Sequence, residues 1–195
     1  MKKFSAPFTA LFALLTLGAS LLVTYLAEGQ VYAVVPSAKL LHYGAVDGDV
    51  WKTNEFWRVV TSQFIHQQTT HMIFYVLMVW TIGSALEIAL GSIPLFVIYW
   101  VGGCAGVYAD LLASPHLVSF GAAPALMALS GAVLVASRKV LTISKGTILS
   151  AVSVIALQAI LDLKFHHFPN TGHLCSLIAG GILALLLVGR KAPLA

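Results

Sequence analysis

Charged side chains are scarce in this chain of 195 residues: Asp, Glu, Lys and Arg make up 9% of it, against 59% hydrophobic residues. A soluble domain carries roughly a quarter charged residues, so the composition excludes a soluble globular fold. The alternating polar and apolar pattern of a transmembrane β-barrel is absent as well. Because a segment in lipid must satisfy its own backbone hydrogen bonds, the apolar runs predict helices, and we expect an all-α membrane protein.

Cysteine is also rare, and the two present, Cys104 and Cys175, lie inside apolar runs. Two isolated thiols make neither a disulfide framework nor a metal site. His66 and His71 are five residues apart, so they do not share a helical face as paired metal ligands would. No run of Lys or Arg interleaved with aromatics indicates nucleic-acid binding. We therefore expect no metal, no other cofactor and no nucleic-acid partner.

Long apolar runs, by contrast, are abundant. A helix that spans the bilayer needs about 20 mostly apolar residues. Six runs reach or approach this length, the fourth and fifth being short: residues 7–27, 72–90, 93–113, 121–137, 147–163 and 173–188. We find no repeat, low-complexity tract or linker, so residues 1–195 are expected to form one domain, with the first run as a retained anchor. The connection from Glu28 to His71 is too apolar for a solvated tether and is predicted to associate partly with the membrane.

The cations indicate an orientation. With six spans, seven of the eleven Lys and Arg residues fall on the side that holds both termini and the fourth-to-fifth loop. The positive-inside rule then places both termini in the cytoplasm. We expect an integral protein of a bacterial inner (plasma) membrane, with the lipid bilayer as its first partner.

Several stretches carry a family resemblance. Residues 55–66 read EFWRVVTSQFIH, with the pair Trp57-Arg58 as the marker, and residues 71–74 read HMIF. Further matching positions are Gly83 to Glu87, Gly91, Tyr99, Gly102, Gly103, Gly106, Gly121-Ala122 and His173-Leu174. Each piece is weak alone, but the ordered set is specific. Over residues 51–181, the chain resembles the rhomboid family of intramembrane serine proteases.

The resemblance implies a six-helix bundle and a defined reaction. In that family, a serine in a Gly-x-Ser-Gly turn at the start of the fourth span attacks a peptide bond. A histidine of the sixth span takes its proton. A histidine and an asparagine on the second span, with backbone amides near the serine, stabilise the oxyanion.

Position by position, this chain keeps only part of that set. Gly121 matches the first glycine of the turn, and His173 and His71 match the two histidines. Ala123 stands where the serine is expected, and Tyr75 replaces the asparagine. Pro124 replaces the second glycine of the turn. Losing the nucleophile of a serine protease costs about a millionfold in turnover. We therefore predict a catalytically inactive pseudoprotease that binds transmembrane segments of other proteins.

The alternative is an active intramembrane serine endopeptidase with a displaced nucleophile. Ser130 lies seven residues after Ala123, about 10 Å deeper along a helix, so His173 would have to shift by two turns. Ser119 is nearer, but its use needs a redrawn loop.

The other matching positions have structural interpretations. Arg58, beside Trp57 and near Glu55, is expected to fix the first loop through hydrogen bonds and an ion pair, and His66 through a hydrogen bond. Gly102 and Gly106 permit close helix contact inside the bundle, with a homo-oligomer as the weaker alternative. We interpret Glu87 and Asp110 as interfacial residues. Gln158 and Asp162 share one face of the fifth span, but the spans hold too few polar residues for an ion path.

Overall fold

The structure is a computed structural model that describes residues 6–140, 142–164 and 170–188, and within them all regular elements are helical. Five helices are long and apolar enough to cross a membrane: α1 (Pro7–Glu28), α5 (Thr69–Leu90), the combined helix Ser92–Ala113, α9 (Lys145–Lys164) and α10 (Thr171–Val188). The combined helix consists of α6 (Ser92–Val97), the π-helical segment η2 (Ile98–Gly102) and α7 (Gly103–Ala113). The predicted all-α membrane bundle is therefore confirmed.

The fourth predicted span is α8 (Ala123–Ala136), which is shorter than the rest. Its 14 residues rise about 21 Å, less than the roughly 30 Å of a hydrocarbon core. Every residue of α8 from Ala123 to Val133 is buried, so this helix is the centre of the bundle. The expectation that the fifth span is short was wrong. Helix α9 has 20 residues because the polar positions Lys145, Gly146 and Lys164 continue the helix.

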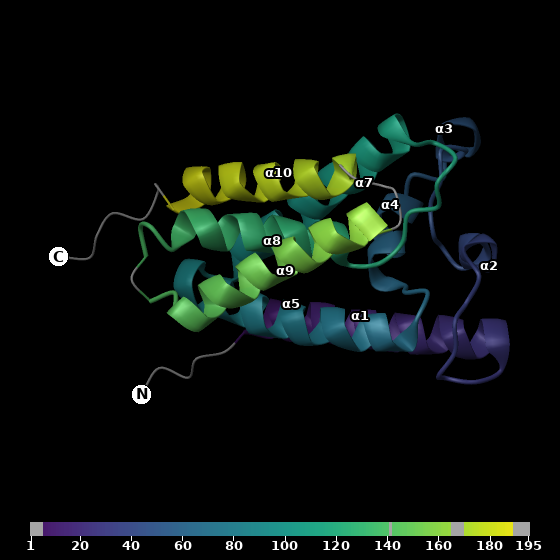
Figure 1. Cartoon of the computed structure of the whole chain (residues 1–195), viewed down its shortest axis with the longest axis horizontal. Coiled ribbons are helices and arrows are strands. Elements are labelled where there is room, and N and C mark those ends of the chain that lie inside the picture. Colours follow the sequence, from purple (N-terminus) through teal and green to yellow (C-terminus); the bar gives the residue numbers. More distant parts are fainter. Residues whose placement is uncertain (1–5, 141, 165–169, 189–195) are drawn as a thin grey trace.

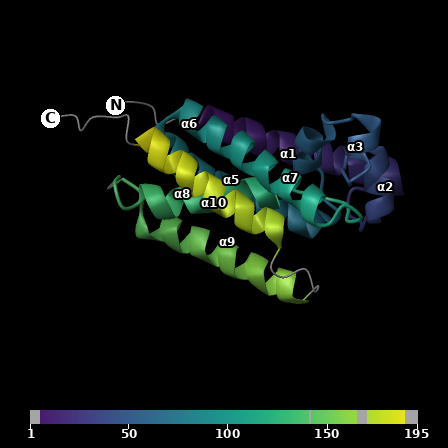
Figure 2. The ribbon, with the colours of Figure 1, turned by 90° about the horizontal axis from the view of Figure 1, so that it is seen from above.

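Different segments of the chain lie at the two ends of the bundle (Figure 1). The start of α1, the end of α10 and the connection from α8 to α9 lie at one end, whereas the first loop and the connection from α7 to α8 lie at the other. Seen from above, α1 and α9 lie on opposite sides of the bundle (Figure 2). This arrangement agrees with grouping both termini on one side. The terminal cations Lys2, Lys3, Arg190 and Lys191 lie outside the described residues.

The start of α1 is fixed to the end of α5 by the Glu87 carboxylate. It accepts hydrogen bonds from the backbone N–H groups of Phe8 (3.1 Å) and Thr9 (2.9 Å) and from the Thr9 hydroxyl (2.7 Å). The first N–H groups of a helix have no partner within the helix, and a negative charge suits that end. Glu87 is 3% exposed, so this contact is buried inside the bundle.

Glycines let the central helices approach closely. A Cβ on Gly131 of α8 would overlap the Leu177 carbonyl of α10, and a Cβ on Gly180 of α10 would overlap the Ala128 carbonyl of α8. On the third span, a Cβ on Gly102 would lie 2.5 Å from the Ala128 Cβ, and one on Gly106 would overlap the Ser176 hydroxyl. Gly102 and Gly106 therefore face the interior of the bundle.

The first loop contains four short helices and packs on the bundle: α2 (Ser37–His42), α3 (Val50–Thr53), α4 (Arg58–Thr61) and the 3-10 turn η1 (Ser62–Phe64). Val35, Leu40 and Ala45 are fully buried, next to Val23 of α1 and Ile65. Trp51 and Trp57 are about half exposed, at 44% and 52%. Such amphipathic rings are common at membrane interfaces.

Arg58 connects separate parts of this loop. Its Nε donates to Glu55 Oε2 at 2.9 Å, and one terminal nitrogen donates to the carbonyls of Leu41 (2.6 Å) and Ala45 (3.2 Å). The guanidinium also lies 4.6 Å from the centre of the Trp57 ring. Because one rigid side chain satisfies carbonyls from α2 and the turn after it, the loop gains a fixed shape.

Candidate functional site

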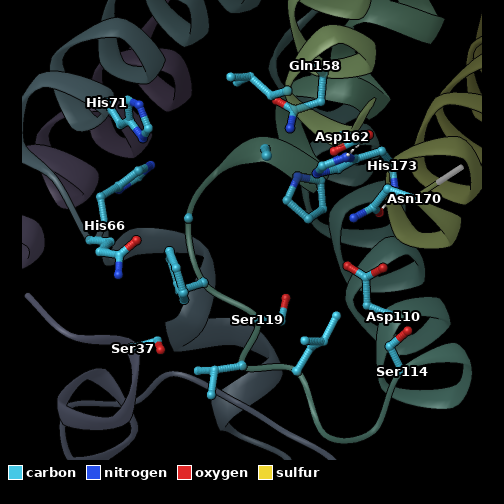
Figure 3. Close-up of a pocket in the computed structure, with 18 of the residues that line it drawn as sticks. Ser37, His66, His71, Asp110, Ser114, Ser119, Gln158, Asp162, Asn170 and His173 are labelled. Carbon is cyan, nitrogen blue, oxygen red and sulfur yellow. Dashed lines mark hydrogen bonds and ion pairs between the residues drawn. The ribbon is translucent and has the colours of Figure 1, made fainter. Parts of the chain in front are cut away.

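A polar cavity of about 600 Å³ opens where the first loop meets the ends of the spans. Helices α5, α7, α8, α9 and α10 all contribute side chains to it, as does the connection from α7 to α8. Ala123, His173, His71, Tyr75 and Gly121 all line this cavity, so the fold brings together the positions that the resemblance selected. In Figure 3, His66 and His71 lie across the cavity from Asp162 and His173.

The turn that precedes α8 depends on glycine and on the first loop. Gly121 has φ +91°, a conformation that L residues with a Cβ rarely adopt. Its N–H donates to the Ser62 carbonyl at 2.8 Å, and the N–H of Ala122 donates to His66 Nε2 at 3.2 Å. Pro124 then occupies the first turn of α8, where a missing N–H costs little. The turn is therefore held from the first loop on one side and by helix geometry on the other.

His66 joins three segments through one chain of hydrogen bonds. Since Ala122 N–H donates to Nε2, the ring proton of neutral His66 lies on Nδ1, which is 3.0 Å from Ser20 Oγ. Ser20 in turn donates to the Phe64 carbonyl at 2.8 Å. Burial, with a smaller effect of His71, lowers the pKa of His66 from 6.5 to about 3. The ring therefore stays neutral, as this arrangement requires.

The described serines differ in their access to the cavity. Ala123, which has no hydroxyl, lines the cavity. Ser130 is fully buried, donates to the Leu126 carbonyl of its own helix at 2.8 Å and does not line the cavity. Ser119 does line it, while its backbone pairs with Val46. Of the two displaced candidates, Ser119 alone can meet a molecule in the cavity.

The first turn of α10 is fixed by two caps. Asn170 Oδ1 accepts the His173 N–H at 2.9 Å, and Asp110 Oδ1 accepts the Gly172 N–H at 2.8 Å. These acceptors satisfy helix donors that otherwise lack partners. Asp110 therefore supports α10 from α7.

The imidazole of His173 is held by a second carboxylate. Its Nδ1 lies 2.9 Å from Asp162 Oδ2 of α9, and the two side chains are 12% and 10% exposed (Figure 3). On the other wall, Tyr75 points to α9 and donates its hydroxyl hydrogen bond to Gln158 Oε1 at 2.9 Å. His71 of α5 is exposed at the cavity.

Sequence reasoning missed the roles of four residues: Asp110, Gln158, Asp162 and Asn170. A signal existed for two of them, because Gln158 and Asp162 are four residues apart in an apolar span, where a polar pair is costly unless it is partnered. Their partners, Tyr75 and His173, come from other helices and cannot be read from spacing. Among the residues that the structure describes, no three His, Cys, Asp or Glu side chains group as a metal site.

The fold and the cavity define a polytopic helical membrane protein with a histidine–carboxylate pair in a polar cavity between its helices. The sequence model of the Rhomboid domain matches residues 53–190, which is more than half of the chain. The chain belongs to the rhomboid family.

Relatives agree with this assignment. The chain is 30% identical over 156 residues to Rhomboid protease GluP of Bacillus subtilis, covering 78% of this chain and 30% of that protein. It is 30% identical over 159 residues to RHOMBOID-like protein 6, mitochondrial, of Arabidopsis thaliana, covering 78% and 50%. RHOMBOID-like protein 1 of the same plant is 26% identical over 158 residues. The chain thus spans half or less of the length of GluP and RHOMBOID-like protein 6.

Proposed function

We propose that this rhomboid-family protein is a pseudoprotease that binds transmembrane segments of other membrane proteins without cutting them. The observation that carries the proposal is the methyl group of Ala123 in the cavity that His173 also lines. Covalent catalysis needs a side-chain hydroxyl or thiol whose proton the general base takes, and an alanine offers none. Loss of a serine nucleophile costs about a millionfold in turnover.

A groove on the lipid side of the bundle supports the binding part of the proposal. It lies between α5 and α9, has a volume of about 390 Å³ and is lined by Phe74, Met78, Leu149, Ser150, Ser153, Val154 and Leu157. In lipid, helices associate by close packing and small residues at the contact. Ser150 and Ser153 leave room for an approaching helix, and the apolar lining suits a segment that already lies in the bilayer.

The membrane orientation forms part of the proposal. Arg138, Lys139 and Lys145 lie at the connection of α8 and α9, at the same end as the start of α1 and the end of α10. The positive-inside rule places that end in the cytoplasm. We place the protein in a bacterial inner membrane. A reporter fused after residue 195 that is active only in the periplasm should stay silent, and activity would reverse the orientation.

The catalytic part is tested with a fluorophosphonate probe, which labels activated serines. The wild-type protein, purified in mild detergent, should remain unlabelled, as should a His173→Ala variant. Labelling of the wild type that disappears in His173→Ala would overturn the pseudoprotease, and mass spectrometry would then identify the serine.

The binding part is tested by a photo-crosslinking residue at Leu157 in the groove, with Leu185 as a control. Leu185 is 47% exposed on α10, away from the groove. We expect single-span proteins at Leu157 and not at Leu185. Equal recovery from both positions would contradict groove binding. Recovery of one fixed partner would instead indicate an assembly subunit.

A second candidate is an active endopeptidase with a displaced nucleophile, and the position of Ser119 at the cavity favours it. In that case Ser119→Ala abolishes probe labelling whereas Ser130→Ala does not. The fully buried position of Ser130 and its bond to Leu126 weigh against a role for that residue.

A further inference from the structure

The contact between His173 and Asp162 determines which ring nitrogen carries the proton. An ionised carboxylate can only accept hydrogen bonds. The 2.9 Å contact therefore places the proton of the neutral ring on Nδ1 and leaves a lone pair on Nε2, at the other side of the ring. Nε2 makes no hydrogen bond with any residue in the described ranges. The lone pair of Nε2 can accept a proton.

The starts of α8 and α10 lie close together, which brings positions 123 and 173 to the same cavity. The contact point is Gly106 of α7: a Cβ there would lie 2.7 Å from the Gly172 carbonyl and 3.1 Å from the Pro124 Cβ. Gly172 precedes His173, and Pro124 follows Ala123. Both Ala123 and His173 line the same cavity. A hydroxyl at position 123 would therefore share the cavity with Nε2.

Asp162 follows another partnered polar residue on α9. It lies one helical turn after Gln158 on the same face of α9, and Gln158 accepts the hydrogen bond of Tyr75 from α5. The backbone of His173 is fixed by Asn170, as the cap of α10. The cap fixes the backbone of His173, and the contact with Asp162 fixes its ring; a catalytic histidine needs this degree of order.

We infer that Asp162 is a positioning residue for His173, and that the pair forms two thirds of a Ser–His–Asp arrangement from which only the hydroxyl at position 123 is missing. The carboxylate holds the tautomer and the orientation of the ring, and it stabilises the charge that the ring acquires with a proton. The inference stands whether or not the groove binds a transmembrane segment, because it concerns the cavity alone.

The test adds the missing hydroxyl. In Ala123→Ser, the serine Oγ forms a bond to the phosphorus of a fluorophosphonate, the phosphorus–fluorine bond breaks, fluoride leaves, and the Oγ proton passes to His173 Nε2. We expect labelling of this variant above the wild type, and a loss of at least about tenfold when Asp162→Leu is added. Asp49→Asn removes a carboxylate from the exposed ion pair with Lys52. It controls for the loss of a negative charge and should leave the labelling of Ala123→Ser unchanged.

A spectroscopic measurement separates positioning from mere folding. In ¹⁵N-histidine spectra of the full chain without the added serine, with His173 assigned by His173→Gln, the Nδ1-protonated tautomer should dominate and be lost in Asp162→Leu. An unchanged tautomer in Asp162→Leu would overturn the role of Asp162. Labelling of Ala123→Ser no faster than the wild type would overturn the placement of Nε2 by position 123. Neither result bears on capture of proteins at Leu157, so the two proposals fail separately.

Discussion

The hydroxyl of Tyr75 on α5 donates a 2.9 Å hydrogen bond to Gln158 Oε1 on α9. The position that resembles the asparagine of the family's oxyanion site thus joins two helices in this protein. The bond lies at the boundary between the polar cavity, which both residues line, and the apolar groove, which begins at Phe74 and Leu157. At this position the tyrosine therefore makes a structural contact between two helices.

Removing this hydroxyl should weaken the contact between α5 and α9. Hydrogen bonds between membrane helices contribute on average about 0.6 kcal/mol, and up to about 1.7. We expect Tyr75→Phe to lower the free energy of unfolding in SDS by an amount in this range. A double-mutant cycle with Gln158→Leu should show that the two effects are not additive. Tyr108→Phe, in a partly exposed ring of α7, is the control; full additivity at Tyr75 and Gln158 would contradict the contact.

Replacing Glu87 should destabilise the fold more than replacing an exposed acidic residue does. Its carboxylate accepts three hydrogen bonds at the start of α1, so Glu87→Gln removes charge and acceptor capacity together. We expect a loss of about 1–3 kcal/mol in the unfolding free energy. Glu28→Gln, in a solvent-exposed pair with Lys39, should cost less than about 1 kcal/mol. Equal effects of the two variants would show that Glu87 does not hold α1.

A methyl group at Gly106 should disturb the meeting point of α7, α8 and α10. It would overlap the Ser176 hydroxyl and crowd the backbone carbonyl of Gly172, which cannot rotate away. Overpacking of this kind costs about 1–3 kcal/mol, measured as unfolding in SDS. Gly18→Ala on α1 is the matched control, since nothing lies within 4 Å of its added Cβ. If Gly106→Ala lowers the free energy of unfolding no more than Gly18→Ala does, the close packing of α7, α8 and α10 at Gly106 would be contradicted.

The free energy of unfolding should fall as the pH is lowered, because His66 is buried as a neutral ring. Its pKa is about 3 in the fold and near 6.5 when the ring is exposed, so below pH 6.5 the unfolded chain binds a proton that the folded chain does not. Stability is then constant above pH 6.5 and declines by about 1.4 kcal/mol per pH unit down to about pH 3. From pH 7.5 to pH 5 the loss is about 2 kcal/mol. His66→Gln should remove this part of the slope, and the same slope in both proteins would assign it to other groups.

Replacing the altered residues of the site by those typical of the family should restore peptide-bond cleavage. We expect Ala123→Ser, Pro124→Gly and Tyr75→Asn together to revive cleavage of a generic transmembrane substrate in proteoliposomes. The triple variant also breaks the bond to Gln158, so its folding should be checked by unfolding in SDS. The same variant with His173→Ala is the control. A folded triple variant that cuts nothing would mean that the cavity as well as the nucleophile has changed.

The sequence could predict much of the fold, because apolar runs of fixed length have few solutions in a bilayer. Five of the six expected spans are long enough to cross, and the family assignment agrees with the motif at Trp57-Arg58. Span ends were less certain: α9 continues to Lys145 and Lys164, where polar residues obscure the hydropathy. The assignment of Ala123 to the position of the family's serine stays a prediction, and it rests on the register of the residues on both sides.

The sequence by itself determined that the chain lies in a membrane, that its spans are helical and that position 123 carries no hydroxyl. Each of these depends on residue type or local spacing. Only the tertiary structure decided the partners of the polar residues. Glu87 meets Thr9, Tyr75 meets Gln158, and Asp162 meets His173, each across a distance along the chain or from another helix. The physical reason is that polar groups among apolar helices must find partners, and the packing of glycine-lined helices decides which partners come within reach.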